Sequence, residues 1–155
     1  MIDALRRTPV AIVALNNAAD TLLSAGGTAS PGGTSSPGGA AEAVHLATIA
    51  LAAIPGAPEA IDTLVRALAA DQRFAEALAA ANGNPDPVLS AIEVAEVELA
   101  RKSTAEARRA LARADARIQA SFAPTRTLAE RMQRLQAAIS EALADDSAHA
   151  NERNE

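Results

Sequence analysis

The sequence predicts an all-α protein: a helical bundle with a long, coiled-coil-like C-terminal antiparallel hairpin, and an N-terminal helix tethered by a Gly/Ser/Pro linker. Apolar residues recur at spacings of three and four, which is the period of an amphipathic helix. Hydrophobic residues make up 49% of the 155-residue chain but aromatic residues only 1%, so alanine supplies much of the apolar content. Capping residues followed by proline, as in Thr8-Pro9 and Asp86-Pro87, are typical of helix starts.

The first segment, residues 1–24, is predicted to be a helix that begins at Pro9. Ile12, Leu15 and Leu22 fall on one face of it. Two arginines precede a short apolar run, but that run is too short and too polar for a convincing targeting signal. No stretch approaches the roughly 20 apolar residues that cross a bilayer. We therefore expect a soluble chain, either cytoplasmic or part of a soluble assembly.

A Gly/Ser/Thr/Pro-rich segment, residues 25–40, follows the first helix. It contains the near-repeat GGTASP and GGTSSP at 26–31 and 32–37. Such a composition buries too little apolar surface to offset the entropy of ordering, so it predicts a flexible linker. A tethered first helix is free to dock on its own chain or to complete the core of a neighbouring copy.

The middle of the chain predicts two or three buried helices. Residues 41–54 are apolar almost all round, which favours burial on every side. Pro55, Gly56 and Pro58 then end that helix and start the next, and Asp71 can cap a separate short helix within the following span. The sequence Asn-Gly-Asn-Pro at 82–85 predicts a turn.

A single long helix is the favoured interpretation of residues 87–122, because no glycine or proline interrupts them. Its two apolar runs are out of phase by one residue, which is typical of a stutter. Ser103 and Glu106 fit a capping box, so two helices separated near Ser103 are the alternative.

The last predicted helix starts after Pro124 and carries the clearest heptad pattern of the chain. With the preceding helix it would form the hairpin, and residues 41–143 would form one domain followed by a disordered polar tail at 144–155. The seam that we expect to pack within the hairpin, or against another subunit, comprises Leu111, Ile118, Leu128, Met132, Leu135 and Ile139.

Charge is distributed unevenly along the chain. The net charge is −5, yet residues 101–134 contain nine basic and three acidic side chains. The predicted basic face comprises Arg101, Arg108, Arg109, Arg113, Arg117, Arg131 and Arg134. These arginines can pair with acidic residues of the facing helix or of another subunit, among them Asp86, Glu93, Glu96 and Glu98, or they can bind phosphates. The overall acidity and the scarcity of aromatic residues for base stacking favour pairing.

No motif predicts catalysis. Glu42-x-x-His45 is half of the pattern found in di-iron helix bundles, but the only other histidine, His149, lies in the predicted tail. No catalytic triad or phosphate-binding loop is present. We therefore expect no enzymatic activity, cofactor, metal or small-molecule substrate.

These observations predict a structural, assembly or adaptor protein that acts through helix–helix contacts. Its partner would be itself, as a homo-oligomer, or another helical protein, and a component of a secretion apparatus or of a phage particle would fit. The alternative is a small nucleic-acid-binding regulator or packaging protein that uses the basic face of residues 101–134.

Overall fold

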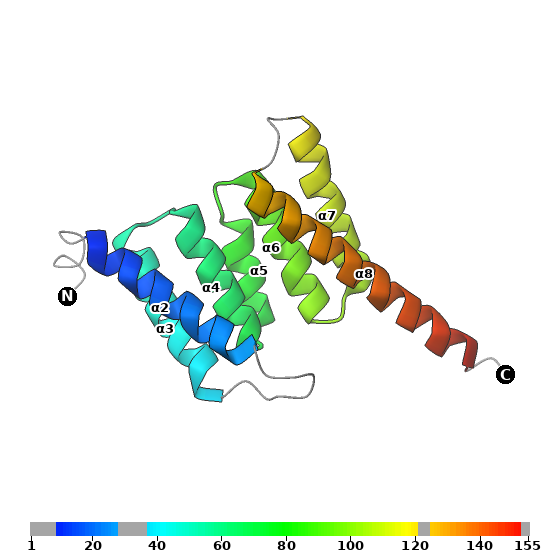
Figure 1. Ribbon diagram of the computed structural model, residues 1–155, viewed down its shortest axis with the longest axis horizontal. Helices are drawn as coiled ribbons and strands as arrows, with labels where there is room; N and C mark the ends of the chain where they lie inside the picture. Colours follow the sequence, from blue (N-terminus) through cyan, green and yellow to red (C-terminus); the bar gives the residue numbers. More distant parts are fainter. Residues whose placement is uncertain (1–8, 28–36, 121–124, 153–155) are drawn as a thin grey trace.

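The protein is helical in every element that the structure describes. The computed structural model describes residues 9–27, 37–120 and 125–152, and this part contains helices and no strand. The predicted all-α class is therefore confirmed (Figure 1). The helices are α2 (Pro9–Gly27), α3 (Pro37–Ala53), α4 (Pro58–Ala70), α5 (Phe74–Asn82), α6 (Pro87–Ala100), α7 (Thr104–Gln119) and α8 (Arg126–Glu152).

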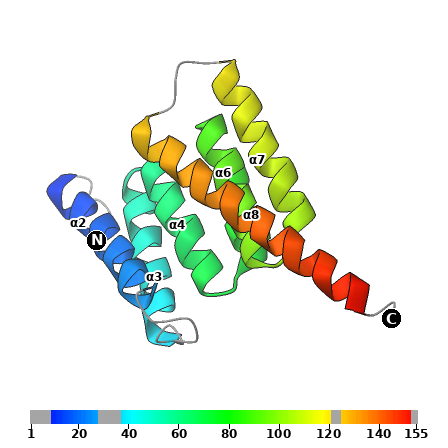
Figure 2. The same cartoon turned by 45° about the vertical axis from the view of Figure 1, so that its right-hand side comes forward.

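Helices that follow one another in the chain pack against one another. Each helix from α2 to α7 contacts the next, α4 also contacts α2 and α6, and α8 contacts both α6 and α7. Figures 1 and 2 show α8 crossing the α6–α7 pair and then running past the edge of the bundle to the C-terminus.

Most of the buried hydrophobic residues are alanines, which let the helix backbones approach closely. The central helix is α6, because it has buried residues on most of its circumference, from Ala91 through Glu98. Ile92, Val65 and Val97 are among the largest fully buried side chains. A few β-branched residues on α4 and α6 therefore contribute much of the apolar area that this core removes from water.

The single long helix predicted over 87–122 is wrong. The chain turns at Arg101–Ser103, where Lys102 adopts a left-handed conformation with φ +63°. Because of this turn α7 folds back on α6, which buries Ala107, Ala110 and Ala114. Ser103 stands at the N-cap as the capping-box alternative predicts, although its hydroxyl makes no capping hydrogen bond.

The hairpin consequently differs from the predicted one. Its two arms are α6 and α7, and α8 is a separate helix that packs across both. The long C-terminal helix itself is present, with 27 residues.

Other predicted boundaries agree with the structure. Asp86 caps α6, because its Oδ1 accepts hydrogen bonds from the backbone N–H groups of Val88 and Leu89 at 2.8 and 3.0 Å. The separate short helix is present, since α4 ends at Ala70 and α5 begins at Phe74, but Asp71 does not cap it: Asp71 follows the end of α4, and the N-cap of α5 is Arg73. A turn follows α5 at the Asn-Gly-Asn-Pro sequence, also as predicted.

Both ends of the predicted linker are helical. The helix α2 extends to Gly27 and α3 begins at Pro37, so the centre of the linker, residues 28–36, lies outside the described residues. The first helix packs on its own chain, where Ile12 and Leu15 contact Ala50 and Ala53 of α3. The burial of α3 is one-sided, because Glu42 and His45 are exposed.

Helix α8 also runs into the segment for which a disordered polar tail is predicted, residues 144–155. Helix α8 continues through 144–152 and ends at Glu152. Alanines in this stretch favour helix strongly enough to continue the preceding turns, and a polar composition does not prevent it.

Candidate protein-interaction surface

The predicted seam residues pack largely inside one chain. Leu135 and Ile139 are buried, and Leu111, Leu128 and Met132 are half-buried against the same core. Ile118 is half-buried near the end of α7. Most of the apolar seam on α8 is therefore used to attach α8 to its own bundle.

Arg131 forms the polar centre of the α8 attachment. Its Nε donates to Glu96 Oε1 at 2.7 Å, and its Nη2 donates to Glu96 Oε2 at 2.6 Å and to Asp62 Oδ1 at 2.7 Å. Burial favours loss of its charge, but the hydrogen bond and charge of Glu96, together with Asp62, raise the pKa of Arg131 above its ordinary value. The guanidinium thus ties α8 to α6 and α4.

A chain of ion pairs continues from this centre to the first helix. Asp62 also accepts a hydrogen bond from Arg66 Nε at 3.2 Å, and Arg66 Nη2 lies 2.6 Å from Asp20 Oδ1 on α2. Four helices, α2, α4, α6 and α8, are therefore joined by alternating charges. The sequence leaves open whether Glu96 pairs with an arginine of a facing helix or of another subunit. In the structure Glu96 pairs with Arg131 of its own chain.

Beneath this network lies the fully buried carboxyl of Glu93. Its Oε1 accepts a hydrogen bond from Asn84 Nδ2 at 2.7 Å, whereas its Oε2 has no hydrogen-bond partner among the described residues. Burial, reinforced by the negative charge of Asp62, raises the pKa of Glu93 to about 8. The carboxyl is therefore mostly protonated at neutral pH, which reduces the cost of burying it.

Part of the predicted basic face is occupied by contacts within the chain. Arg101 pairs with Glu98 and Arg109 pairs with Glu106. Arg117 donates a hydrogen bond to the backbone carbonyl of Pro87. With Arg131 in the buried network, four of the seven predicted arginines already have partners.

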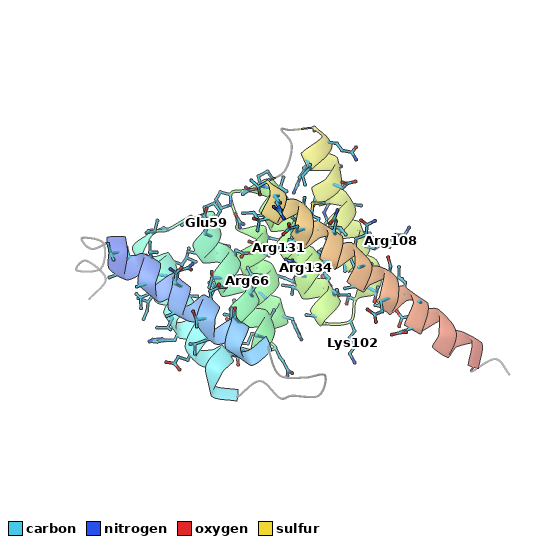
Figure 3. All side chains as sticks on the ribbon, in the orientation of Figure 1. Glu59, Arg66, Lys102, Arg108, Arg131 and Arg134 are labelled. Carbon is cyan, nitrogen blue, oxygen red and sulfur yellow. The ribbon has the colours of Figure 1, made fainter. Side chains whose placement is uncertain are left out.

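Three arginines of the predicted face remain without an ion pair or side-chain hydrogen bond to any described residue. These are Arg108 and Arg113 on α7 and Arg134 on α8, all of which are exposed. Figure 3 shows Arg134 beside Arg131 and Arg66, whereas Arg108, on α7, lies away from them, near the later part of α8. The cationic surface is therefore confined to the neighbourhood of α7 and α8.

A groove of about 440 Å³ lies between α7 and α8 at this place. Its apolar lining comes from both helices, and Arg108, Asp115, Gln136 and Ser140 supply its polar groups. We call this hollow the α7–α8 groove; its apolar lining residues are Leu111, Ala112, Met132, Ile139 and Leu143. An apolar floor with polar groups beside it is the composition that receives an amphipathic helix.

A second hollow, of about 420 Å³, lies over the ion-pair network and is lined by Asp62, Arg66, Glu96, Arg131, Arg134 and Leu135. Most of its charged groups bind one another. Its principal role is therefore the attachment of α8 to the bundle.

The described part of the chain has neither a metal-binding cluster nor a membrane-spanning helix. Glu42 and His45 are exposed on α3, and no group of three or more His, Asp or Glu side chains in this part could hold a metal ion. Of the described helices, none has the length and apolar character needed to cross a membrane.

Comparisons of the chain with protein-family models, with curated proteins and with solved structures give no match.

Sequence reasoning missed the residues that organise the network. Asn84 is part of the predicted turn, but nothing in its local sequence indicates that its amide reaches Glu93. Asp62 and Arg66 are four residues apart, a spacing that favours an ion pair on one helix face. This spacing is the one feature of the sequence that could have indicated part of the network.

Proposed function

We propose that this protein is a non-enzymatic assembly or adaptor protein that binds a helical partner through the α7–α8 groove. The observation that carries the proposal is the open apolar groove itself, which combines half-buried Leu111 and Met132 with the unpaired cation Arg108. The partner is a second copy of this chain or another helical protein.

The thin alanine core supports this proposal. Alanine contributes little buried area per residue, so association that covers more apolar surface adds stability. The well-packed α6 needs no such help, whereas the groove leaves partly exposed side chains at the edge of the core.

The experiment is a pair of measurements on the full chain. Light scattering after size-exclusion chromatography, across protein concentration, measures self-association. A photo-activated cross-linking residue placed at Leu111, with a matched one at exposed Glu42 on α3, detects other partners in extracts of the native host. A mass above the 15.8 kDa monomer, or a discrete product at Leu111 and not at Glu42, is expected. A monomer with no product specific to Leu111 would contradict the proposal.

Nucleic-acid binding is the less favoured alternative, because Arg109, Arg117 and Arg131 are engaged within the chain. Its test is the fluorescence anisotropy of labelled DNA and RNA at low salt. Salt-sensitive binding that is lost when Arg108, Arg113 and Arg134 are together replaced by Ser would favour this alternative.

A further inference from the structure

A buried carboxyl lies beneath the ion pairs that attach α8 to the bundle. Glu93 on α6 is fully buried, and its Oε2 has no hydrogen-bond partner among the described residues. Asn84 donates only to Oε1. A neutral acid tolerates this environment, whereas an ionised carboxylate needs donors at both oxygens because an unpaired buried charge is costly. Glu93 therefore ionises only if Oε2 gains a donor, which can be water.

Charged groups act on Glu93 from α4, α6 and α8. Asp62 of α4 and Glu96 of the same helix are negative, and Arg131 of α8 is positive. The buried residues of α5 and α7 are alanines and Thr104, so these two helices bury no ionisable side chain. Arg131 already donates to both Asp62 and Glu96. An ionised Glu93 is therefore a third carboxylate beside a guanidinium that is already shared by two.

Of the helices around this cluster, α8 is the one that moves away at the least cost. Among the described helices it packs against only α6 and α7, whereas α4 packs against α2, α3, α5 and α6. Figure 2 shows α8 lying across the outside of the bundle. The hollow of about 420 Å³ over the ion pairs is lined by Asp62, Glu96 and Arg131, among others. Displacement of α8 removes Arg131 and lets water from this hollow hydrate the three carboxylates.

We propose that α8 is a pH-controlled arm, which leaves the bundle when Glu93 loses its proton. Its departure widens the α7–α8 groove and exposes Leu135 and Ile139, which are buried against the core in the attached state. A helical partner of the groove then binds more tightly as the pH rises, because more of its binding surface is accessible. This inference rests on the proposed function and adds a regulation of the same groove.

The direction of the pH effect follows from the proton that release sets free. In the attached state burial raises the pKa of Glu93 to about 8, whereas the ordinary value for a hydrated carboxyl is 4.5. Between these two values the attached state keeps a proton that the released state loses. The ratio of released to attached α8 therefore rises by up to about tenfold per pH unit in this range and levels off above pH 8.

Hydrogen exchange of the full chain at pH 5, 6, 7 and 8, corrected for the intrinsic exchange rates, measures this release. A helix detached from the bundle frays in water, so the amides of α8 exchange through the released state. Protection in residues 128–143 is expected to be lower than in α6 and to fall by up to about tenfold per pH unit. Helix α2 is the internal reference, because it is also an edge helix and its protection is expected to change much less.

Glu93→Gln tests the role of the carboxyl, since glutamine cannot ionise and keeps an acceptor for Asn84. It is expected to abolish the pH dependence of protection in α8. Glu42→Gln makes the same change at an exposed site on α3 and is expected to keep the wild-type pH dependence. Circular dichroism checks that both variants are helical.

Three results for the wild type would overturn the pH-controlled arm and leave the proposed function standing. These are protection in α8 equal to that in α6, protection in α8 that does not change with pH, and an equally steep fall in α2. The Leu111 cross-link at pH 6 and pH 8 tests the proposed function separately. A monomer with no product specific to Leu111 at either pH would contradict that function, even if α8 is released.

Discussion

Glu93 makes the stability of this protein depend on pH. Its pKa is raised to about 8 in the folded protein, chiefly by burial, from an ordinary value of 4.5. Between these two values the folded state keeps a proton that the unfolded state releases. The contribution of Glu93 to stability is therefore fully present below pH 4.5 and is lost as the pH rises to 8, at up to about 1.4 kcal/mol per pH unit.

Replacing Glu93 by Gln tests whether Glu93 lowers the stability of the fold as the pH rises. Glutamine keeps an acceptor for Asn84 and cannot ionise, so the free energy of unfolding of Glu93→Gln is expected to change less with pH than that of the wild type. Urea denaturation at pH 5, 6, 7 and 8 measures the free energy of unfolding of both proteins. At each higher pH the variant is expected to become more stable relative to the wild type. Parallel pH profiles would show that Glu93 ionises normally in the folded protein.

Arg131 is predicted to stabilise the fold because it pairs with Asp62 and Glu96 at once. Arg131→Met leaves Glu96 without its cation and leaves Asp62 with Arg66 alone, and both carboxylates are mostly buried. Since some solvent reaches them, we expect a loss of about 2 kcal/mol in the free energy of unfolding. Arg126→Met is the control: its side chain is 93% exposed, so its loss is expected to stay within about 0.5 kcal/mol. Equal losses for the two variants would mean that the network contributes nothing.

The turn between α6 and α7 depends on one strained residue. Lys102 has φ +63°, a conformation that costs a residue with a Cβ about 1–2 kcal/mol and that glycine adopts freely. Replacing Lys102 by glycine would remove this cost, but the greater entropy of glycine in the unfolded chain offsets part of the stabilisation. Lys102→Gly is therefore expected to raise the free energy of unfolding by about 0.5 kcal/mol, as measured by urea denaturation. Lys102→Ala removes the same exposed side chain without relieving the strain, and a similar gain there would contradict this explanation.

Helices at the centre and at the edges of the bundle differ in how much apolar surface they bury. The arrangement of α8 shows the difference within one helix, because its first half packs on α6 and α7 while its last turns project past them (Figure 2). An edge helix can thus be firmly attached at one end and remain available for partners at the other.

The whole molecule is predicted to open from its edges. The most buried helix, α6, contacts α4, α5, α7 and α8, whereas α2 contacts only α3 and α4 among the described helices. Hydrogen exchange followed by mass spectrometry should therefore show the slowest amides in α6 and faster exchange in α2 and beyond residue 144 of α8. Exchange in α6 as fast as in α2 would mean that the core is not organised around α6.

Local sequence was sufficient for the class of the fold and for several helix starts. The Asp86 side chain accepts from the N–H groups of Val88 and Leu89, two and three residues away, and Pro87 has no N–H to satisfy, so a short stretch contains all the necessary information. The apolar spacing from Leu128 to Ile139 likewise predicts which face of α8 is buried, because one helix face is defined by local periodicity.

The break at Lys102 and the ion-pair network required contacts between distant residues. No glycine marks the turn, so the burial of Ala107 and Ala110 against α6 compensates for its strain. The partners of Arg131 lie 35 and 69 residues away in the chain, and no spacing rule reaches that far. Local chemistry therefore determines where helices begin and which face is apolar, whereas packing decides which charges become buried and which remain available to a partner.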